Sequence, residues 1–161
     1  MRTIWTVGHS TREWPQFLSL LMQAGIEAVA DVRRYPGSRR HPQFAAATIA
    51  GGLAEAGIEY VPMVDLGGRR NPRKDSPNTA WRNASFRGYA DYMATDEYRK
   101  ARDRLEAIAS TRRTAVMCAE AYWTQCHRSL ISDDLKSRGW PVVHLISPHR
   151  AEEHPHTKAA R

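Results

Sequence analysis

The chain has 161 residues, of which 42% are hydrophobic, and a formal net charge of +7 at pH 7. This length favours a single domain over residues 1–161. No apolar run approaches the roughly 20 residues that span a bilayer and no signal peptide opens the chain, so we expect a cytoplasmic protein with no membrane partner.

Hydrophobic patterning predicts alternating strands and helices, beginning with a strand over residues 2–7. Ser10 to Glu13 matches a capping box, and apolar residues at helical spacing from Trp14 to Met22 predict a helix that Gly25 ends. The next predicted elements, in chain order, are a strand over 26–32, a helix over 44–56, a strand over 58–64, helices over 86–93 and 96–110 (the second capped by Thr95), a strand over 114–119, a helix over 126–138 and a strand over 142–146.

Two loops rich in basic residues separate these elements and favour acidic partners, either a phosphate-bearing small molecule or nucleic acid. The first loop contains the segment Ser38-Arg39-Arg40-His41. The second loop contains Arg69, Arg70, Arg73 and Lys74. Tyr35, Trp81 or Trp123 could stack on bases beside them. Solvated surface loops are the alternative interpretation.

The order of strands and helices predicts an α/β protein. We expect a three-layer domain, with a mostly parallel sheet of about five strands covered by helices on both faces. The carboxyl ends of parallel strands share one edge, where ligands bind in open α/β sheets. Segments with polar or small residues lie at the ends of all five predicted strands and should converge there: Gly8-His9-Ser10, Asp31-Val32-Arg33, Leu66-Gly67-Gly68, Cys118-Ala119-Glu120 and Ser147.

Several motifs together resemble the domain of unknown function 488 (DUF488) family across nearly the whole chain. The motifs are Thr6-Val7-Gly8-His9-Ser10, Asp31-Val32-Arg33, Pro36, Ser38-Arg39, Leu66-Gly67-Gly68, Met117-Cys118-Ala119-Glu120, Cys126-His127-Arg128-Ser129-Leu130, Glu153-His154-Pro155 and Thr157. The resemblance implies a compact α/β domain. It implies no known reaction, because the family is named for lacking one.

Cys126, His127 and Arg128 carry the most suggestive chemistry. If a helix begins at Cys126, its free amides and macrodipole, with positive charge from the two neighbours, should lower the pKa of the thiol and make Cys126 a nucleophile. Arg128 could alternatively bind a phosphate at the helix start. The structural alternative is a buried Cys126 with Arg128 paired to Glu120.

Cys118 ends an apolar strand, where an unpaired cysteine is usually inert core, although it could point into the cleft. Glu120 would face the same side as Cys118 if the strand persists, as a general base or as a partner that orients His127 or Arg128. These two residues complete the predicted catalytic set with Cys126 and His127.

The sequence requires no cofactor, but the two cysteines leave two alternatives open. Cys118, Cys126 and His127, with His9 as a fourth ligand, would make a zinc donor set. The spacing is not that of a CxxC pair, however, and adjacent Cys-His ligands are geometrically awkward. A redox pair between the two cysteines, reduced in a cytoplasmic protein, is the second alternative.

The predicted substrate-binding residues follow the strand ends and the first basic loop. They are His9, Ser10, Asp31, Arg33, Ser38, Arg39, Gly67, Gly68 and Arg128. Ser10 has the alternative role of capping the first helix. Asp31 and Arg33 have the alternative of pairing with each other, since charges at an interior strand end need partners.

The leading functional hypothesis is an enzyme that acts on a phosphate-bearing substrate, a nucleotide or a nucleic acid. Cys126 would be the nucleophile, His127 and Glu120 would handle protons, and Arg33, Arg39 and Arg128 would bind the anion. The alternatives are a non-catalytic nucleic-acid-binding module and a ligand-sensing domain that does not turn its ligand over.

Overall fold

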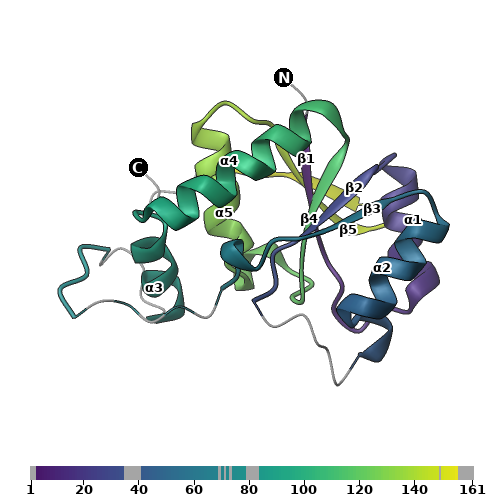
Figure 1. Cartoon of the computed structure of the whole chain (residues 1–161), viewed down its shortest axis with the longest axis horizontal. Coiled ribbons are helices and arrows are strands. Elements are labelled where there is room, and N and C mark those ends of the chain that lie inside the picture. Colours follow the sequence, from purple (N-terminus) through teal and green to yellow (C-terminus); the bar gives the residue numbers. More distant parts are fainter. Residues whose placement is uncertain are drawn as a thin grey trace.

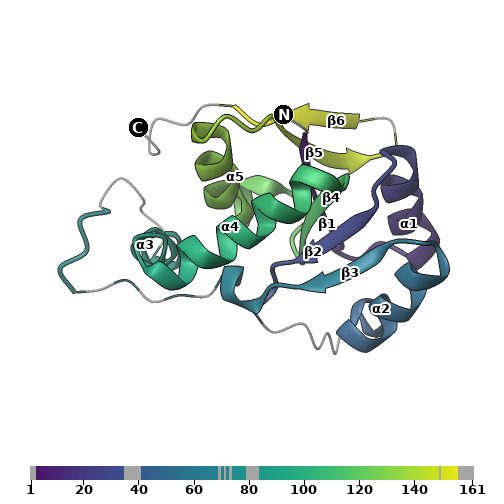
Figure 2. The same cartoon turned by 45° about the horizontal axis from the view of Figure 1, so that its top comes forward.

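The computed structural model describes residues 3–34, 41–68, 70, 72, 74–78, 84–148 and 150–155, and these contain one six-stranded sheet (Figure 1). The strands are β1 (Ile4–Gly8), β2 (Ala28–Asp31), β3 (Glu59–Pro62), β4 (Thr114–Cys118), β5 (Val142–Ser147) and β6 (Arg150–Glu153). Their order is β3-β2-β4-β1-β5-β6, with β3 and β6 at the two edges (Figure 2). The first five are parallel and β6 is antiparallel to β5. The predicted mostly parallel sheet is confirmed.

Helices cover both faces of this sheet. They are α1 (Trp14–Gln23), α2 (Ala46–Glu55), α3 (Ala84–Tyr92), α4 (Asp96–Thr111) and α5 (Arg128–Ser137), with single 3₁₀ turns at η1 (Pro42–Phe44), η2 (Val64–Leu66) and η3 (Trp123–Gln125). Helices α1 and α2 pack on one face through a core that includes Phe17 and Leu53, whereas α3, α4 and α5 pack on the other through Tyr89, Leu105 and Leu130 (Figure 1). The predicted three-layer α/β class is therefore confirmed.

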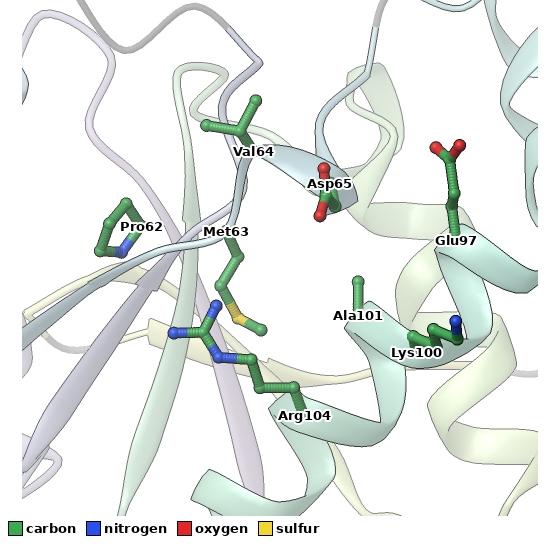
Figure 3. Close-up of a pocket in the computed structure, with 8 residues that line it drawn as sticks. All are labelled: Pro62, Met63, Val64, Asp65, Glu97, Lys100, Ala101 and Arg104. Atoms are coloured by element: carbon green, nitrogen blue, oxygen red, sulfur yellow. The ribbon is translucent and has the colours of Figure 1, made fainter.

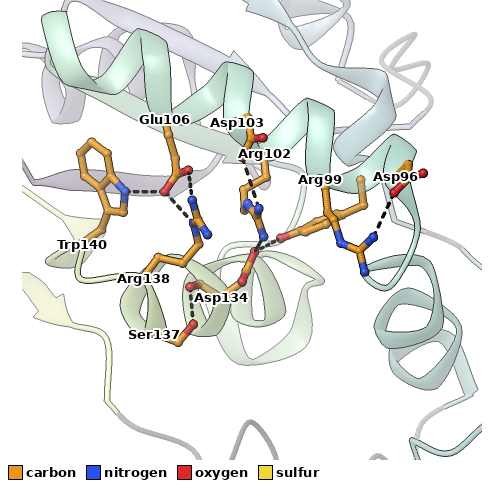
Figure 4. A network of polar contacts seen from close by, with 10 residues as sticks. Asp96, Arg99, Arg102, Asp103, Glu106, Asp134, Ser137, Arg138 and Trp140 are labelled. Atoms are coloured by element: carbon orange, nitrogen blue, oxygen red, sulfur yellow. Dashed lines mark hydrogen bonds and ion pairs between the residues drawn. The ribbon is translucent and has the colours of Figure 1, made fainter.

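Polar contacts fix α5 against α4 (Figure 4). Glu106 accepts two hydrogen bonds from Arg138, each 2.9 Å long, and one of 2.7 Å from the indole of Trp140. Nearer the start of both helices, Asp134 on α5 accepts a hydrogen bond from the hydroxyl of Tyr98 on α4 at 2.8 Å. These contacts hold the outer side of α5, so its inner side has a fixed position over the sheet.

The start of α1 differs from the prediction. The N-cap is Glu13, whose capping box is completed by Gln16, so the predicted box from Ser10 to Glu13 is wrong. The chain after β1 stays attached to the sheet instead, because Ser10 donates its amide to Ala119 at 2.9 Å, and Ser10 adopts a left-handed φ of 47°. The predicted Thr95 cap of α4 is confirmed, since its hydroxyl accepts the Tyr98 amide at 3.3 Å.

Gly8, the last residue of β1, makes possible the close approach of the loop that follows β4. A Cβ atom at Gly8 would lie 1.6 Å from the carbonyl oxygen of Glu120, so only glycine fits. Gly8 is paired in register with Cys118. The ends of β1 and β4 therefore form one surface, and the loop from β4 to α5 folds back over it. Among the described helices, none has the length and apolarity needed to cross a membrane.

Candidate active site at the start of helix α5

The two cysteines meet at the carboxyl end of β4. Cys118 is the last residue of β4, Cys126 lies two residues before α5, and their sulfur atoms are 2.7 Å apart, with Cys126 as donor. Both thiols are free and buried, 1% and 5% exposed. The Cys126 sulfur also accepts the backbone amide of Arg128 at 3.5 Å. The start of α5 thus fixes Cys126, and Cys126 in turn holds the sulfur of Cys118.

The two thiols differ in acidity. Burial raises the pKa of Cys118, but the hydrogen bond from Cys126 and the charge of Arg128 outweigh it, so the net shift is downward. Burial raises the pKa of Cys126 well above its usual value, and the neighbouring Cys118 raises it further. These directions do not support the predicted lowered pKa of Cys126. A proton shared between two sulfurs stays on the donor, which here is Cys126, and the more acidic thiol is Cys118.

His127 lies beside the thiols as a neutral imidazole. Its Nδ1 is 3.4 Å from the Cys126 sulfur, and its Nε2 is 3.0 Å from the carbonyl oxygen of Val32. Because a carbonyl only accepts, Nε2 carries the proton and Nδ1 is an acceptor, which faces the Cys126 thiol beside the shorter contact of that thiol with Cys118. Burial lowers the pKa of His127 to about 4. His127 therefore adds no positive charge near pH 7, contrary to the prediction, but it can receive a proton.

Gly67 and Gly68 serve this arrangement through their small size. A Cβ atom at Gly68 would lie 2.7 Å from Nδ1 of His127, and one at Gly67 would lie 2.6 Å from the Cα atom of Arg34. Both glycines therefore let the chain after η2 pack closely on the site. The sequence predicted that these glycines contact a substrate. In the structure they leave room for Arg34 and for the His127 ring.

Arg128, the first residue of α5, is buried with an incomplete set of partners. Its side chain is 1% exposed, and Nη2 donates to the carbonyl oxygen of Ala121 at 2.9 Å, whereas Nε and Nη1 have no hydrogen-bond partner. The hydroxyl of the next residue, Ser129, is also buried without a partner. Buried donors are nearly always satisfied in folded proteins, so three unsatisfied donors on adjacent residues call for an explanation.

Glu120 takes no part through its carboxylate in the contacts that the structure describes. It is exposed, and the alternative in which it pairs with Arg128 is wrong, since the carbonyl oxygen of Ala121 takes that place. Strand β4 ends at Cys118. The alternation of side chains along a strand therefore does not extend to Glu120, which would otherwise face the same side as Cys118. The backbone of Glu120 does contribute, because its carbonyl oxygen is 3.7 Å from the Cys118 thiol.

The sequence analysis missed a buried chain of polar side chains beside Arg128. The hydroxyl of Thr6 is 2.5 Å from Nδ1 of His144, Nε2 of His144 is 2.8 Å from Nδ1 of His154, and Nε2 of His154 is 2.6 Å from Oδ1 of Asp133. All four side chains are buried. We call them the histidine chain. His154 was noted only within the motifs of the family resemblance, and helical spacing from Ser129 to Asp133 was the available signal for a polar inner face.

A second polar group lies on the other face of the sheet. Arg33 binds Asp31 through two hydrogen bonds of 2.9 and 2.6 Å and donates to the carbonyl oxygen of Phe44 at 2.7 Å. The Tyr60 hydroxyl donates a further hydrogen bond to Oδ2 of Asp31 at 2.6 Å. The alternative in which Asp31 and Arg33 pair with each other is therefore the one the structure adopts, and the guanidinium of Arg33 is already occupied.

His9 belongs to this second group and not to the thiols. Its ring stacks on Phe44 with a centroid distance of 4.6 Å, and its Nδ1 is 3.0 Å from the carbonyl oxygen of Ser10. Burial lowers the pKa of His9 to about 4. Phe44 is part of the core under α1 and α2, whereas both cysteines are part of the core under α3, α4 and α5. The predicted residues thus share one edge of the sheet but divide between its two faces.

The predicted basic loops are described only in part. Ser38 and Arg39 lie outside the described residues, as do Arg40, Arg69, Arg73, Tyr35 and Trp81. Arg70 stacks on the ring of Tyr92 at 3.8 Å from its centroid and donates to the carbonyl oxygen of Gly67 at 3.2 Å. Trp123 stacks on His144 with a centroid distance of 4.7 Å, so its ring covers the histidine chain.

The zinc alternative is not supported by the arrangement of these side chains. Within the part of the chain that the structure describes, no group of three or more His, Cys, Asp or Glu side chains could hold a metal ion. His9, the fourth member of the predicted donor set, packs on Phe44 on the other face of the sheet.

A pocket of about 720 Å³ opens elsewhere, between the end of β3 and α4 (Figure 3). Its lining residues are Pro62, Met63, Val64, Asp65, Glu97, Lys100, Ala101 and Arg104. None of the residues predicted for the site is among them. Its charged residues are exposed side chains on and near the outer face of α4, which is typical of a solvated helix surface.

Comparison with known proteins gives a family but no activity. A family model described as "Domain of unknown function DUF488" matches residues 13–135. No curated protein and no solved structure matches the chain.

Proposed function

The chain belongs to the family of domain of unknown function DUF488, a name that assigns no reaction, and from the site itself we propose a thiol-dependent enzyme that acts on a phosphate-bearing substrate. The observation that carries the proposal is Arg128, a buried guanidinium with two unpartnered nitrogens next to a thiol pair. In this proposal Arg128 binds the phosphate and Cys118 is the nucleophile. Cys126 and His127 are positioned to support Cys118.

An oxyanion is the ligand that best satisfies the start of α5. Phosphate oxygens accept hydrogen bonds from the planar fork of an arginine, which has the right spacing for two contacts at once. Nε and Nη1 of Arg128 and the Ser129 hydroxyl are the donors available for such a ligand. The positive end of the helix macrodipole adds to the attraction, and the net charge of +7 favours an anionic substrate.

The thiol pair supports cleavage of a phosphate ester. Thiolates are the nucleophilic form of cysteine, and both a hydrogen-bond donor and a nearby cation stabilise them. The Cys118 sulfur would form a bond to phosphorus while the bond from phosphorus to the leaving oxygen breaks, and that oxygen takes up a proton. Water would then attack the phosphorus, lose a proton, and break the phosphorus–sulfur bond to restore the thiolate.

Two measurements test the two parts of the proposal. Isothermal titration with inorganic phosphate should show binding that Arg128→Lys weakens about tenfold or more, since lysine keeps the charge but loses the fork. The matched control is Arg99→Lys, an exposed arginine paired with Asp96. Hydrolysis of p-nitrophenyl phosphate should be lost in Cys118→Ser while phosphate binding persists. Absence of phosphate binding by the unaltered protein would overturn the proposal.

The two other hypotheses stay predictions. Nucleic-acid binding rests on the basic loops, most of which lie outside the described residues, and no described contact favours it. A ligand-sensing domain would bind phosphate at Arg128 without hydrolysing any ester, and the same pair of measurements separates it from an enzyme. Whether the substrate is a nucleotide or a nucleic acid, and the cytoplasmic location, are likewise predictions from the sequence.

A further inference from the structure

The histidine chain joins three elements of the fold through consecutive hydrogen bonds. It starts at Thr6 in the middle of β1, crosses to His144 on β5, continues to His154 just after β6, and ends at Asp133 on α5. Its three links measure 2.5, 2.8 and 2.6 Å. Asp133 lies on the same helix as Arg128, so the chain and the proposed phosphate site share one element.

The hydrogen bonds of the chain have one consistent arrangement without an added proton and two with one. A carboxylate at Asp133 only accepts, so Nε2 of His154 carries a proton in all three. Without the added proton both imidazoles are neutral, His144 donates to His154, and Thr6 donates to His144. The added proton can make His154 doubly protonated, in which case the two other bonds reverse their direction. It can instead make His144 doubly protonated, but burial of His144 disfavours that arrangement. A proton added at the Thr6 end is thus held as a His154–Asp133 ion pair.

Positive charge around the chain opposes that added proton. Burial, the neighbouring His154 and, least of the three, the charge of Arg128 lower the pKa of His144 to about 2. The ammonium of Lys136 donates to the carbonyl oxygen of His154. Trp123 covers the chain with an uncharged ring, stacked on His144 and edge-on to His154. Asp133 is the carboxylate in direct contact with His154, while Glu153 lies 3.9 Å from Lys136 and Glu152 accepts the indole N–H of Trp123.

We propose that anion binding at Arg128 is coupled to the uptake of one proton by the histidine chain. The inference rests on the proposed function, because it requires an anion at Arg128. A bound dianion offsets the charge of Arg128 and so favours the doubly protonated His154. The affinity for the anion must then rise by the same factor as the affinity for the proton.

Sulfate is the probe of choice, because it is tetrahedral, doubly charged and does not titrate near neutral pH. Isothermal titration with sulfate in two buffers of different ionisation enthalpy gives the number of protons taken up. We expect close to one proton per sulfate, and an affinity that rises up to tenfold for each unit fall in pH. In ¹⁵N-labelled protein, both nitrogens of His154 should become protonated when sulfate binds.

Asp133→Asn removes the carboxylate that stabilises the added proton and should abolish the proton uptake and the pH dependence while sulfate still binds. The control is Asp134→Asn, since Asp134 faces Tyr98 and Arg102 and has no part in the chain. His154→Gln serves as a second variant if Asp133→Asn does not fold. Sulfate binding by the unaltered protein without proton uptake would overturn this inference and leave the proposed function standing. No binding of sulfate or phosphate would overturn both.

Discussion

The Cys126 thiol donates a hydrogen bond to the Cys118 sulfur across 2.7 Å. This single contact makes the cysteine at the end of β4 chemically different from the one before α5, because the donor must keep its proton for the acceptor to lose one. It also reverses the roles that spacing alone suggests. Proximity to a helix start favours Cys126, yet the structure uses that helix start to orient a donor and leaves the acceptor at the end of β4.

Alkylation should therefore begin at Cys118. Because its pKa is lowered by Cys126 and Arg128 against the effect of burial, while that of Cys126 is raised, iodoacetamide should modify Cys118 at lower pH. Mass spectrometry of native protein across a pH series measures this for each site. Both thiols are nearly inaccessible, 1% and 5% exposed, so the rates also report opening of the loop.

The control for that experiment is the choice of substitution at Cys126. Cys126→Ala removes the donor and should shift the alkylation of Cys118 to higher pH, whereas Cys126→Ser keeps a donor and should shift it less. Faster modification of Cys126 than of Cys118 in the unaltered protein would contradict the assignment.

Periodicity was sufficient to predict most of the fold. Apolar runs revealed the five parallel strands, and helical spacing revealed the five helices to within a few residues. Strand β6 escaped prediction because Arg150–Glu153 has no apolar alternation and its residues are mostly exposed. Antiparallel pairing with the neighbouring strand β5, in which Arg150 pairs with Ser147, holds it in the sheet.

The sequence was enough to predict where the site lies, but not which of its side chains contact one another. The carboxyl ends of the strands do meet at one edge, yet the side chains near that edge divide between the two faces of the sheet. Arg33 turns toward Phe44 on the face covered by α1 and α2, whereas Arg128 is part of α5 on the other face. The link from Thr6 to His144 joins residues 138 positions apart. Such a contact follows from two strands becoming neighbours, and the sequence of either strand alone carries no sign of it.

Arg33 and Tyr60 should matter for stability and not for phosphate binding. Arg33→Ala leaves the buried Asp31 carboxylate without its ion pair, which typically costs roughly 3–5 kcal/mol of unfolding free energy. Tyr60→Phe removes one hydrogen bond to Asp31 and should cost about 1 kcal/mol. Urea unfolding measures both, and Tyr60→Phe should bind phosphate as the unaltered protein does. A large loss of phosphate affinity in Tyr60→Phe would move this group into the site.

Buried neutral histidines should make the fold sensitive to acid. The pKa of His9 and of His127 is lowered to about 4, and that of His144 to about 2, in each case chiefly by burial, from a value near 6.5. A folded-state pKa below the unfolded one means that the unfolded chain binds more protons. The stability they contribute is present above pH 6.5 and is lost as the pH falls from about 6.5 to about 4 for His9 and His127, and to about 2 for His144.

Each such histidine should lower the unfolding free energy by about 1.4 kcal/mol per pH unit within that window. Urea unfolding at several pH values between 7 and 4.5 measures the slope. His9→Gln should reduce the slope by the contribution of one histidine, about 1.4 kcal/mol per pH unit, whatever its effect on the unfolding free energy at pH 7. A free energy of unfolding that does not change between pH 6.5 and 5 would show that these imidazoles are protonated in the folded protein.

Gly8 should be the most sensitive glycine of the site. In Gly8→Ala the new methyl group would lie 1.6 Å from the carbonyl oxygen of Glu120 and 2.5 Å from its carbon, both backbone atoms, so the loop after β4 must move. That loop carries the carbonyl oxygen of Ala121, which holds Nη2 of Arg128. The substitution should therefore lower both stability, measured with urea, and phosphate affinity, measured by titration calorimetry.

Gly51→Ala is the matched control for this substitution. Gly51 lies within α2, a Cβ atom added to it would have no neighbour within 4 Å, and alanine is the better helix former by roughly 0.5–1 kcal/mol. Gly51→Ala should thus stabilise the protein and leave phosphate binding unchanged. The contrast separates a general cost of removing glycine from the specific need for contact between β1 and the loop. A Gly8→Ala protein as stable as the original would mean that the loop is not held against β1, and that Arg128 is positioned by other contacts.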